Sequence, residues 1–166
     1  MKLKTSLTRF RKPSTNDHGG SLVETALLLG TLGPVLLLGT TESAFLAYQA
    51  IELSNAAAAG ASYAVQFYMA NSNTALPTQS QVAAAVQNDA PELQRMLKSG
   101  TQISVTMATG CTGNAPTAGN SIPSCLAGVQ PYVQITTQAT LRSIVNAPGL
   151  PSSLTLTRSA TMVMVN

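Results

Sequence analysis

A long run without charge, close to the N-terminus, constrains this chain more than any other feature. No charged residue occurs from Thr25 to Thr41, and the apolar character continues from Ser43 to Ile51 with Glu42 as the only charge between. A helix needs about 20 mostly apolar residues to cross a bilayer. We therefore expect a helix here that anchors the chain in a membrane.

The residues before this run predict its orientation. Five basic residues lie within the first twelve positions: Lys2, Lys4, Arg9, Arg11 and Lys12. By the positive-inside rule, such a cluster stays in the cytoplasm, so the chain after about residue 50 lies on the other side. The alternative is a secretory signal peptide, which also has basic residues followed by an apolar stretch. The apolar region of a signal peptide is roughly 7–15 residues long, and this one is longer. Its small residues Ala44 and Ala47 keep that alternative open.

The rest of the chain is close to neutral. After residue 19 only four basic residues remain, against five acidic ones. A nucleic-acid-binding domain gathers Lys and Arg on one face. We therefore do not expect nucleic acid as a partner.

Glu24 stands at the start of the apolar run. A carboxylate there costs a few kcal/mol unless it is paired or lies at the membrane interface, and the positive end of the helix dipole also favours it. Those effects need no particular spacing from a glycine. Here Gly19 and Gly20 precede it in the order His-Gly-Gly-Ser-Leu-Val-Glu-Thr.

This order resembles the processing site of type IV pilin-like precursors, in which a prepilin peptidase cuts after Gly and Glu is the fifth mature residue. The resemblance implies cleavage between Gly19 and Gly20, which makes Glu24 the fifth residue. It also implies a role for Glu24 in assembly. The carboxylate would neutralise the free N-terminal amine of a neighbouring subunit, offsetting the desolvation of two lone charges.

The resemblance extends over residues 19–66, which are similar to the N-terminal region of TadE-like proteins, pseudopilins of the tight-adherence (Tad/Flp) pilus. The segments that carry it are Gly19, Val23-Glu24, Pro34, Gly39–Glu42 and Asn55–Ala64. Thr25 stands where the family usually has Phe or Tyr, and the sister TadF-like group remains an alternative. The resemblance implies a minor pilin or pseudopilin in the bacterial inner membrane that takes part in pilus assembly for surface adherence. Its implied partners are membrane lipid, TadF-like and Flp-type pilins, the inner-membrane platform and the prepilin peptidase.

The helix should continue beyond the bilayer. Apolar residues recur at spacings of three and four through Leu46, Ala50, Leu53, Ala57, Gly60, Ala64 and Phe67. This pattern predicts one helix from Leu22 to about Met69, with a kink at Pro34 because proline removes an internal hydrogen bond. We expect three parts: a basic cytoplasmic leader (1–19), a transmembrane and spine helix (20–70) and a periplasmic domain (71–166).

The periplasmic part is predicted to be α+β. Gln81–Leu97 has a helical pattern interrupted near Pro91, and Asp89 and Glu92 are placed to cap a second start. After Gly100 the pattern changes to alternation of apolar and polar residues, which predicts strands. These strands are expected around 103–107, within 129–141 and within 153–165, giving a small antiparallel sheet of about three strands.

Both cysteines lie in a loop rich in Gly, Pro, Asn, Ser and Thr, within Gly110–Gly128. A disulfide between Cys111 and Cys125 would stabilise this loop by about 3 kcal/mol in the chain-entropy model and suits an oxidising periplasm. Two free thiols are the alternative for a cytosolic domain. A zinc site is not expected, because two cysteines without a nearby histidine lack the four ligands that zinc needs.

Catalysis is not expected either, and neither is a cofactor. The only histidine, His18, lies in the segment that processing would remove, so no Ser-His or Cys-His pair could form in the mature chain. The alternative to a pilus subunit is an uncleaved single-pass membrane protein. Its periplasmic domain would bind a partner without entering a filament.

Overall fold

The computed structural model describes residues 18–97, 99–143 and 152–165. Most of the predicted leader therefore lies outside the described residues. The chain divides into two compact units, residues 1–39 and 40–166.

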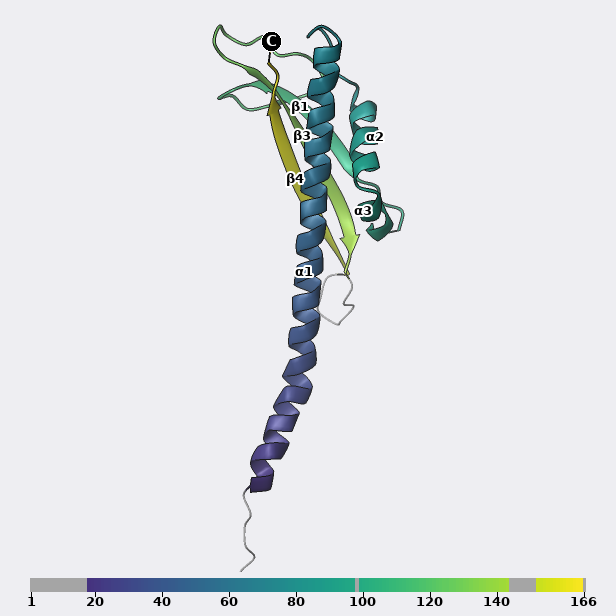
Figure 1. Ribbon diagram of the computed structural model, residues 1–166, viewed down its shortest axis with the longest axis vertical. Coiled ribbons are helices and arrows are strands. Elements are labelled where there is room, and N and C mark those ends of the chain that lie inside the picture. The colour runs from purple at the N-terminus through teal and green to yellow at the C-terminus, as the bar shows by residue number, and fades with distance from the viewer. Residues whose placement is uncertain (1–17, 98, 144–151, 166) are drawn as a thin grey trace, which may run out of the picture. The chain divides into compact units, whose positions relative to one another are not determined.

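One helix, α1, accounts for the N-terminal part of the described chain. It runs from His18 to Ala70, so it begins earlier than the predicted start at Leu22 and ends where the pattern predicted (Figure 1). Pro34 lies inside it and does not end it. The predicted kink at Pro34 stays a prediction.

The second unit contains a four-stranded antiparallel sheet with the order β2-β1-β3-β4 (Figure 1). The strands are β1 (Ser104–Cys111), β2 (Thr117–Ala118), β3 (Pro131–Arg142) and β4 (Ser153–Val163). The three long strands lie where the alternating pattern predicted them, and the α+β class is confirmed. The fourth strand, β2, was not predicted because two exposed residues carry no pattern.

Two short helices follow the turn after α1. Helix α2 (Gln79–Asp89) begins with a capping box, in which Thr78 and Gln81 bond reciprocally to each other's backbone N–H. Helix α3 (Pro91–Met96) has proline at its first position, as expected. The predicted capping role of Asp89 is wrong, because Asp89 is the last residue of α2. Ala90 precedes α3 and offers no side chain to cap it.

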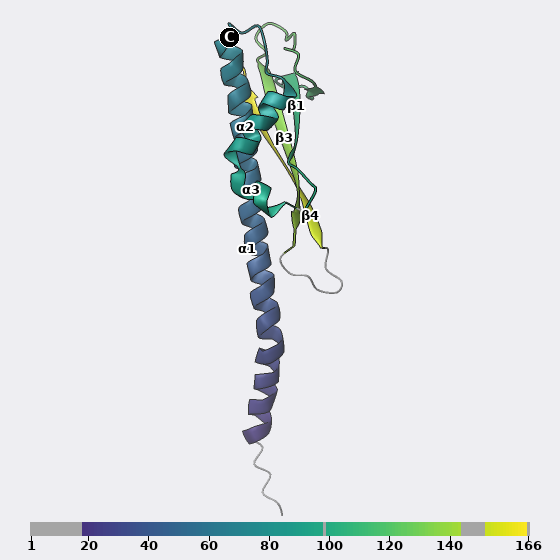
Figure 2. The same ribbon diagram turned by 90° about the vertical axis from the view of Figure 1, so that its right-hand side faces the viewer.

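The second unit has two layers, with the helices on one face of the sheet (Figure 2). From residue 40 onward, α1 packs with α2 and the inward side chains of β1 and β3 in one hydrophobic core. The buried α1 residues are mostly small: Ala56, Ala57, Gly60, Ala61 and Ala64. Small side chains let the helix backbone approach its neighbours closely. A Cβ added at Gly60 would lie 2.7 Å from Val86 Cγ2.

Hydrogen bonds tie the two layers together. The Oγ1 atom of the fully buried Thr137 lies 3.2 Å from the carbonyl oxygen of Leu53 on α1, within hydrogen-bonding distance. The Nε2 atom of Gln79 donates to the carbonyl oxygen of Val105 at 2.7 Å, which joins the start of α2 to β1. These contacts fix where α1 and α2 sit on the sheet.

Candidate anchoring and assembly site

Residues 20–39 of α1 form an exposed apolar surface. All of them are exposed except Gly33, which is partly exposed. The large apolar side chains range from 53% exposed at Leu28 to 73% exposed at Leu22. A helix that is apolar all round is stable only where something covers it, which means a protein core or a membrane. In length and composition this helix can cross a membrane; a signal sequence near the N-terminus meets the same criteria.

Polar side chains within this segment satisfy themselves locally. The hydroxyl of Thr25 donates to the carbonyl oxygen of Ser21 at 2.8 Å, and that of Thr31 donates to Leu27 O at 2.8 Å. Hydroxyls bonded in this way are tolerated in apolar surroundings because no donor is left over. Thr25 is therefore compatible with a membrane-spanning helix.

Glu24 is placed differently from these threonines. It lies on the exposed surface of α1, and its carboxylate has no hydrogen bond or ion pair with any other described residue. Gly19 and Gly20 lie in the first turn of the same helix. The structure thus puts the predicted processing site and Glu24 on one continuous helix. It supplies no partner for the carboxylate within the described chain.

A second carboxylate, Glu42, lies just beyond the uncharged run. The hydroxyl of Ser143, at the end of β3, donates to Glu42 Oε1 at 2.8 Å. This bond connects positions that are 101 residues apart in sequence. It ties the end of the sheet to α1, and no local sequence signal indicated it.

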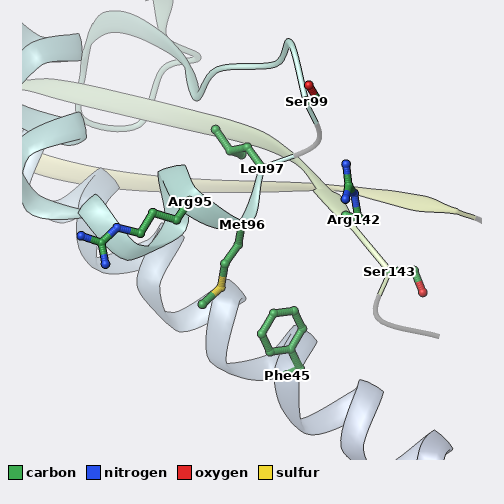
Figure 3. Close-up of a pocket in the computed structure, with 7 residues that line it drawn as sticks. All are labelled: Phe45, Arg95, Met96, Leu97, Ser99, Arg142 and Ser143. Atoms are coloured by element: carbon green, nitrogen blue, oxygen red, sulfur yellow. The ribbon is translucent and has the colours of Figure 1, made fainter. Parts of the chain in front are cut away.

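A pocket of about 310 Å³ lies beside this bond, within the second unit. Figure 3 shows Phe45 of α1 and Met96 of α3 on one side, with Arg142 and Ser143 at the end of β3 on the other. Leu97, Ser99 and Arg95 complete the lining. The pocket therefore combines an apolar wall with a cationic rim.

Gln49 is a buried polar residue that the sequence pattern did not single out. Its side chain is 0% exposed, and its Nε2 atom lies 3.5 Å from the sulfur of Met96. Its Oε1 atom has no hydrogen-bond partner among the described residues. A buried carbonyl oxygen without a donor costs about 1–3 kcal/mol, so Gln49 is a locally unfavourable element of the helix interface.

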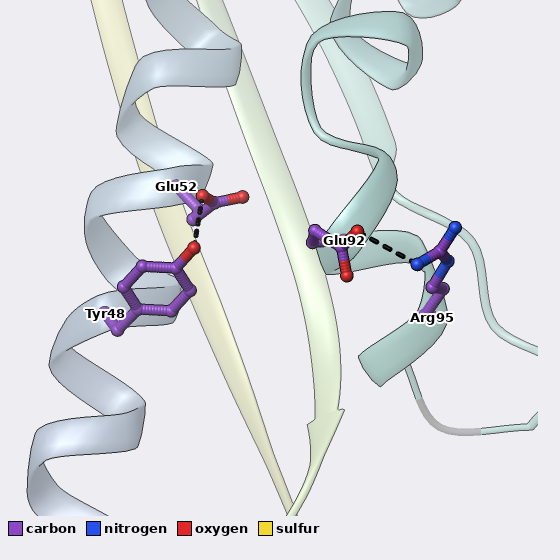
Figure 4. Close-up of polar contacts among 4 residues, drawn as sticks. All are labelled: Tyr48, Glu52, Glu92 and Arg95. Carbon is purple, nitrogen blue, oxygen red and sulfur yellow. Dashed lines mark hydrogen bonds and ion pairs between the residues drawn. The ribbon is translucent and has the colours of Figure 1, made fainter.

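Two other carboxylates are engaged at the surface (Figure 4). The hydroxyl of Tyr48 donates to Glu52 one helical turn away at 2.9 Å. Arg95 donates to Glu92 at 2.9 Å within α3, and both side chains are well exposed. Exposed pairs of this kind contribute about 0–1 kcal/mol.

The disulfide predicted from the loop composition is present. It joins Cys111 at the end of β1 to Cys125, with 5.6 Å between their Cα atoms. Several further bonds hold the loop: Thr112 N to Gln130 O, Gly119 N to Met107 O, Thr109 Oγ1 to Ser121 O, and Tyr132 OH to Asn114 O. The loop is thus tied to β1 and β3 at several points. Leu126 projects from it with 83% of its surface exposed.

Comparisons with known proteins return no match: no family model, no curated protein and no solved structure is similar to this chain at the level required. The arrangement of the helix and the sheet can still be compared with known folds. A long apolar N-terminal helix packs, through its C-terminal half, on a four-stranded antiparallel sheet that carries a disulfide. This architecture is pilin-like. It is consistent with a type IV pilin-like fold and does not by itself name a function.

Proposed function

We propose that this chain is a minor pilin or pseudopilin that takes part in assembling a tight-adherence (Tad/Flp) pilus for surface adherence. The observation that carries the proposal is the exposed apolar segment of α1, which contains one unpartnered carboxylate, Glu24. The same helix continues into the core of a pilin-like domain. Such a helix can serve both as a membrane anchor and as a contact between subunits.

In this proposal the N-terminal segment of α1 spans the bacterial inner membrane. The basic leader lies in the cytoplasm and the disulfide-bonded domain lies in the periplasm. The disulfide supports this orientation, because disulfides persist in the periplasm and are rare in the cytosol. The chain is proposed to act without catalysis.

Glu24 is proposed to pair with the N-terminal amine of a neighbouring subunit. A prepilin peptidase would create that amine by cutting before Gly20. An isolated carboxylate in a bilayer costs about 3 kcal/mol on insertion scales, and a paired one costs less. The neighbours proposed are TadF-like and Flp-type pilins, held by an inner-membrane platform.

The test compares Glu24→Ala and Glu24→Gln with the control Glu52→Gln, which changes a partly exposed carboxylate of the same helix within the folded domain. Pilus number is counted in cells that depend on the mutated copy, and membrane fractionation reports anchoring. Both Glu24 variants should remain in the membrane and lower piliation, whereas Glu52→Gln should leave piliation unchanged. Normal piliation in both Glu24 variants would remove the assembly role.

The second candidate is an uncleaved single-pass membrane protein whose periplasmic domain binds a partner outside a filament. Thr25 favours it, because this position departs from the aromatic residue usual after the processing-site Glu. The two candidates differ at the mature N-terminus, which is Gly20 in the first and Met1 in the second.

A further inference from the structure

The pocket beside the Glu42–Ser143 bond has the chemistry of an amphipathic site. Phe45, Met96 and Leu97 provide apolar surface, while Arg142 and Ser99 provide hydrogen-bond donors. The hydroxyl of Ser143 already donates to Glu42. Its volume of about 310 Å³ is at the lower end of ligand-binding pockets. It can therefore hold a small polar group with the beginning of an apolar chain.

Among the described residues that line this pocket, Arg142 is the cation whose side chain makes no hydrogen bond or ion pair with another described residue. Its side chain is exposed. Arg95 also lines the pocket, but Figure 3 shows its guanidinium turned away from Arg142, and it is paired with Glu92. A guanidinium offers five donors in a planar fork that matches phosphate oxygens.

The position of the pocket along α1 indicates how close it lies to the membrane surface. Phe45 follows Thr41, the last residue of the uncharged run, by about 6 Å at 1.5 Å per residue. If that run spans the bilayer, Phe45 and the groups around it lie at the level of the lipid headgroups. Aromatic and arginine side chains are favoured at that level.

We propose that this pocket binds the phosphodiester headgroup of a phospholipid from the leaflet in which α1 emerges. The inference rests on the proposed membrane anchor. Arg142 holds the phosphate, and Phe45, Met96 and Leu97 contact the glycerol and the first carbons of the acyl chains. The bound lipid is then a defined part of the junction between membrane and domain.

The charges around the pocket predict which headgroup fits. The Glu42 carboxylate is one hydrogen bond away from the lining, through Ser143. A carboxylate close to the lining offers an acceptor that suits a headgroup with an amine. Phosphatidylethanolamine should therefore bind at least as well as phosphatidylglycerol, whereas a merely basic surface would favour the anionic lipid.

The experiment uses the full chain, extracted from membranes in a phosphate-free detergent. Phosphatidylethanolamine or phosphatidylglycerol is titrated in, and native mass spectrometry measures the lipid-bound fraction. Arg142→Gln should weaken binding of either lipid about fivefold, the effect expected for one basic residue near a membrane surface. The matched control is Arg158→Gln, which removes an exposed arginine of β4 that does not line the pocket. It should leave lipid binding unchanged.

Three results would overturn the proposal. The first is equal lipid binding by Arg142→Gln and the unaltered chain, with a thermal unfolding midpoint that shows both are folded. The second is equal loss in Arg158→Gln, which would indicate nonspecific charge attraction. The third is displacement of the lipid by millimolar inorganic phosphate, which would assign the pocket to a free anion.

The membrane anchor is tested separately from the pocket. Membrane fractionation of the unaltered chain and of Arg142→Gln should give the same membrane-bound fraction. If both fractionate with the membrane and bind lipid equally, the headgroup site fails and the anchor stands. If the unaltered chain is found in the soluble fraction without detergent, the membrane anchor and with it the proposed function are refuted, whatever the lipid binding.

Discussion

At Gly60, α1 lies close against its neighbours, and changing this residue tests how the helix is held on the domain. A Cβ at this position would lie 2.7 Å from Val86 Cγ2 and 3.3 Å from both Ile135 Cγ2 and Val82 Cγ1. Carbon atoms that are not bonded to each other pack at about 3.5–4.0 Å. Because all three neighbours are fully buried, the added methyl group can be accommodated only if α1 or these side chains move.

Two opposing effects set the expected stability of Gly60→Ala. Alanine favours the helix over glycine by about 1 kcal/mol. Overpacking a dense core costs about 1–3 kcal/mol. We expect a net loss of about 1 kcal/mol in the free energy of unfolding. Gly39→Ala is the control, because its Cβ would meet nothing within 4 Å, and it should not destabilise the chain.

A double-mutant cycle with Val86→Ala gives the sharper result. Val86→Ala alone should cost about 2 kcal/mol through lost burial and the cavity that it leaves. In the double variant the new methyl group occupies part of that cavity. The combined loss should therefore be smaller than the sum of the single losses by about 1 kcal/mol.

The assay is equilibrium unfolding in urea of the full chain in detergent, followed by the near-ultraviolet circular dichroism of its tyrosines. Strict additivity of the two substitutions would refute the close contact between Gly60 and Val86. A Gly60→Ala variant stabilised as much as Gly39→Ala would refute it as well.

Three further substitutions test other parts of the domain. Replacing Cys111 and Cys125 together by alanine should lower the free energy of unfolding by about 3 kcal/mol, measured by urea unfolding, and an unchanged midpoint would contradict the role given to the disulfide. Thr137→Val keeps the shape but removes a hydroxyl whose oxygen lies 3.2 Å from the Leu53 carbonyl oxygen and 3.3 Å from that of Arg158, and should cost about 1 kcal/mol in the same assay; a neutral effect would show that this hydroxyl does not hold α1. Tyr132→Phe removes the hydroxyl that donates to a loop carbonyl at 2.8 Å. It should lower the midpoint of thermal unfolding by a few degrees. An unchanged midpoint would show that the Tyr132 hydroxyl does not stabilise the loop.

Elements with a long periodic pattern were predictable from the sequence. The apolar stripe that includes Leu53 and Ala64 located the buried face of α1, because spacings of three and four repeat along one side of a helix. Alternation located β1, β3 and β4, because successive side chains of a strand point to opposite faces. The antiparallel sheet followed from strands joined by loops without long crossover helices.

Features that depend on distant or unpatterned residues were not predictable. The Ser143–Glu42 bond joins residues 101 positions apart, and nothing near either residue indicates the other. Gln49 is buried beside Met96 of α3, and the sequence pattern carried no signal for the burial of this polar side chain. The break between α2 and α3 was expected near Pro91. The N-cap of α3 was assigned to Asp89, but the structure has Ala90 there, and an alanine in the sequence does not indicate a cap.

The N-terminus of the protein extracted from its native membrane tests the central claim most directly. Intact-mass spectrometry, supported by N-terminal sequencing, identifies the first residue in cells with and without the prepilin peptidase. We predict a chain that begins at Gly20 when the peptidase is present and at Met1 when it is deleted. A chain that begins at Met1 in both would contradict processing as a pilin. One that begins after Ala44 or Ala47 would identify a secretory signal peptide and contradict the membrane anchor itself.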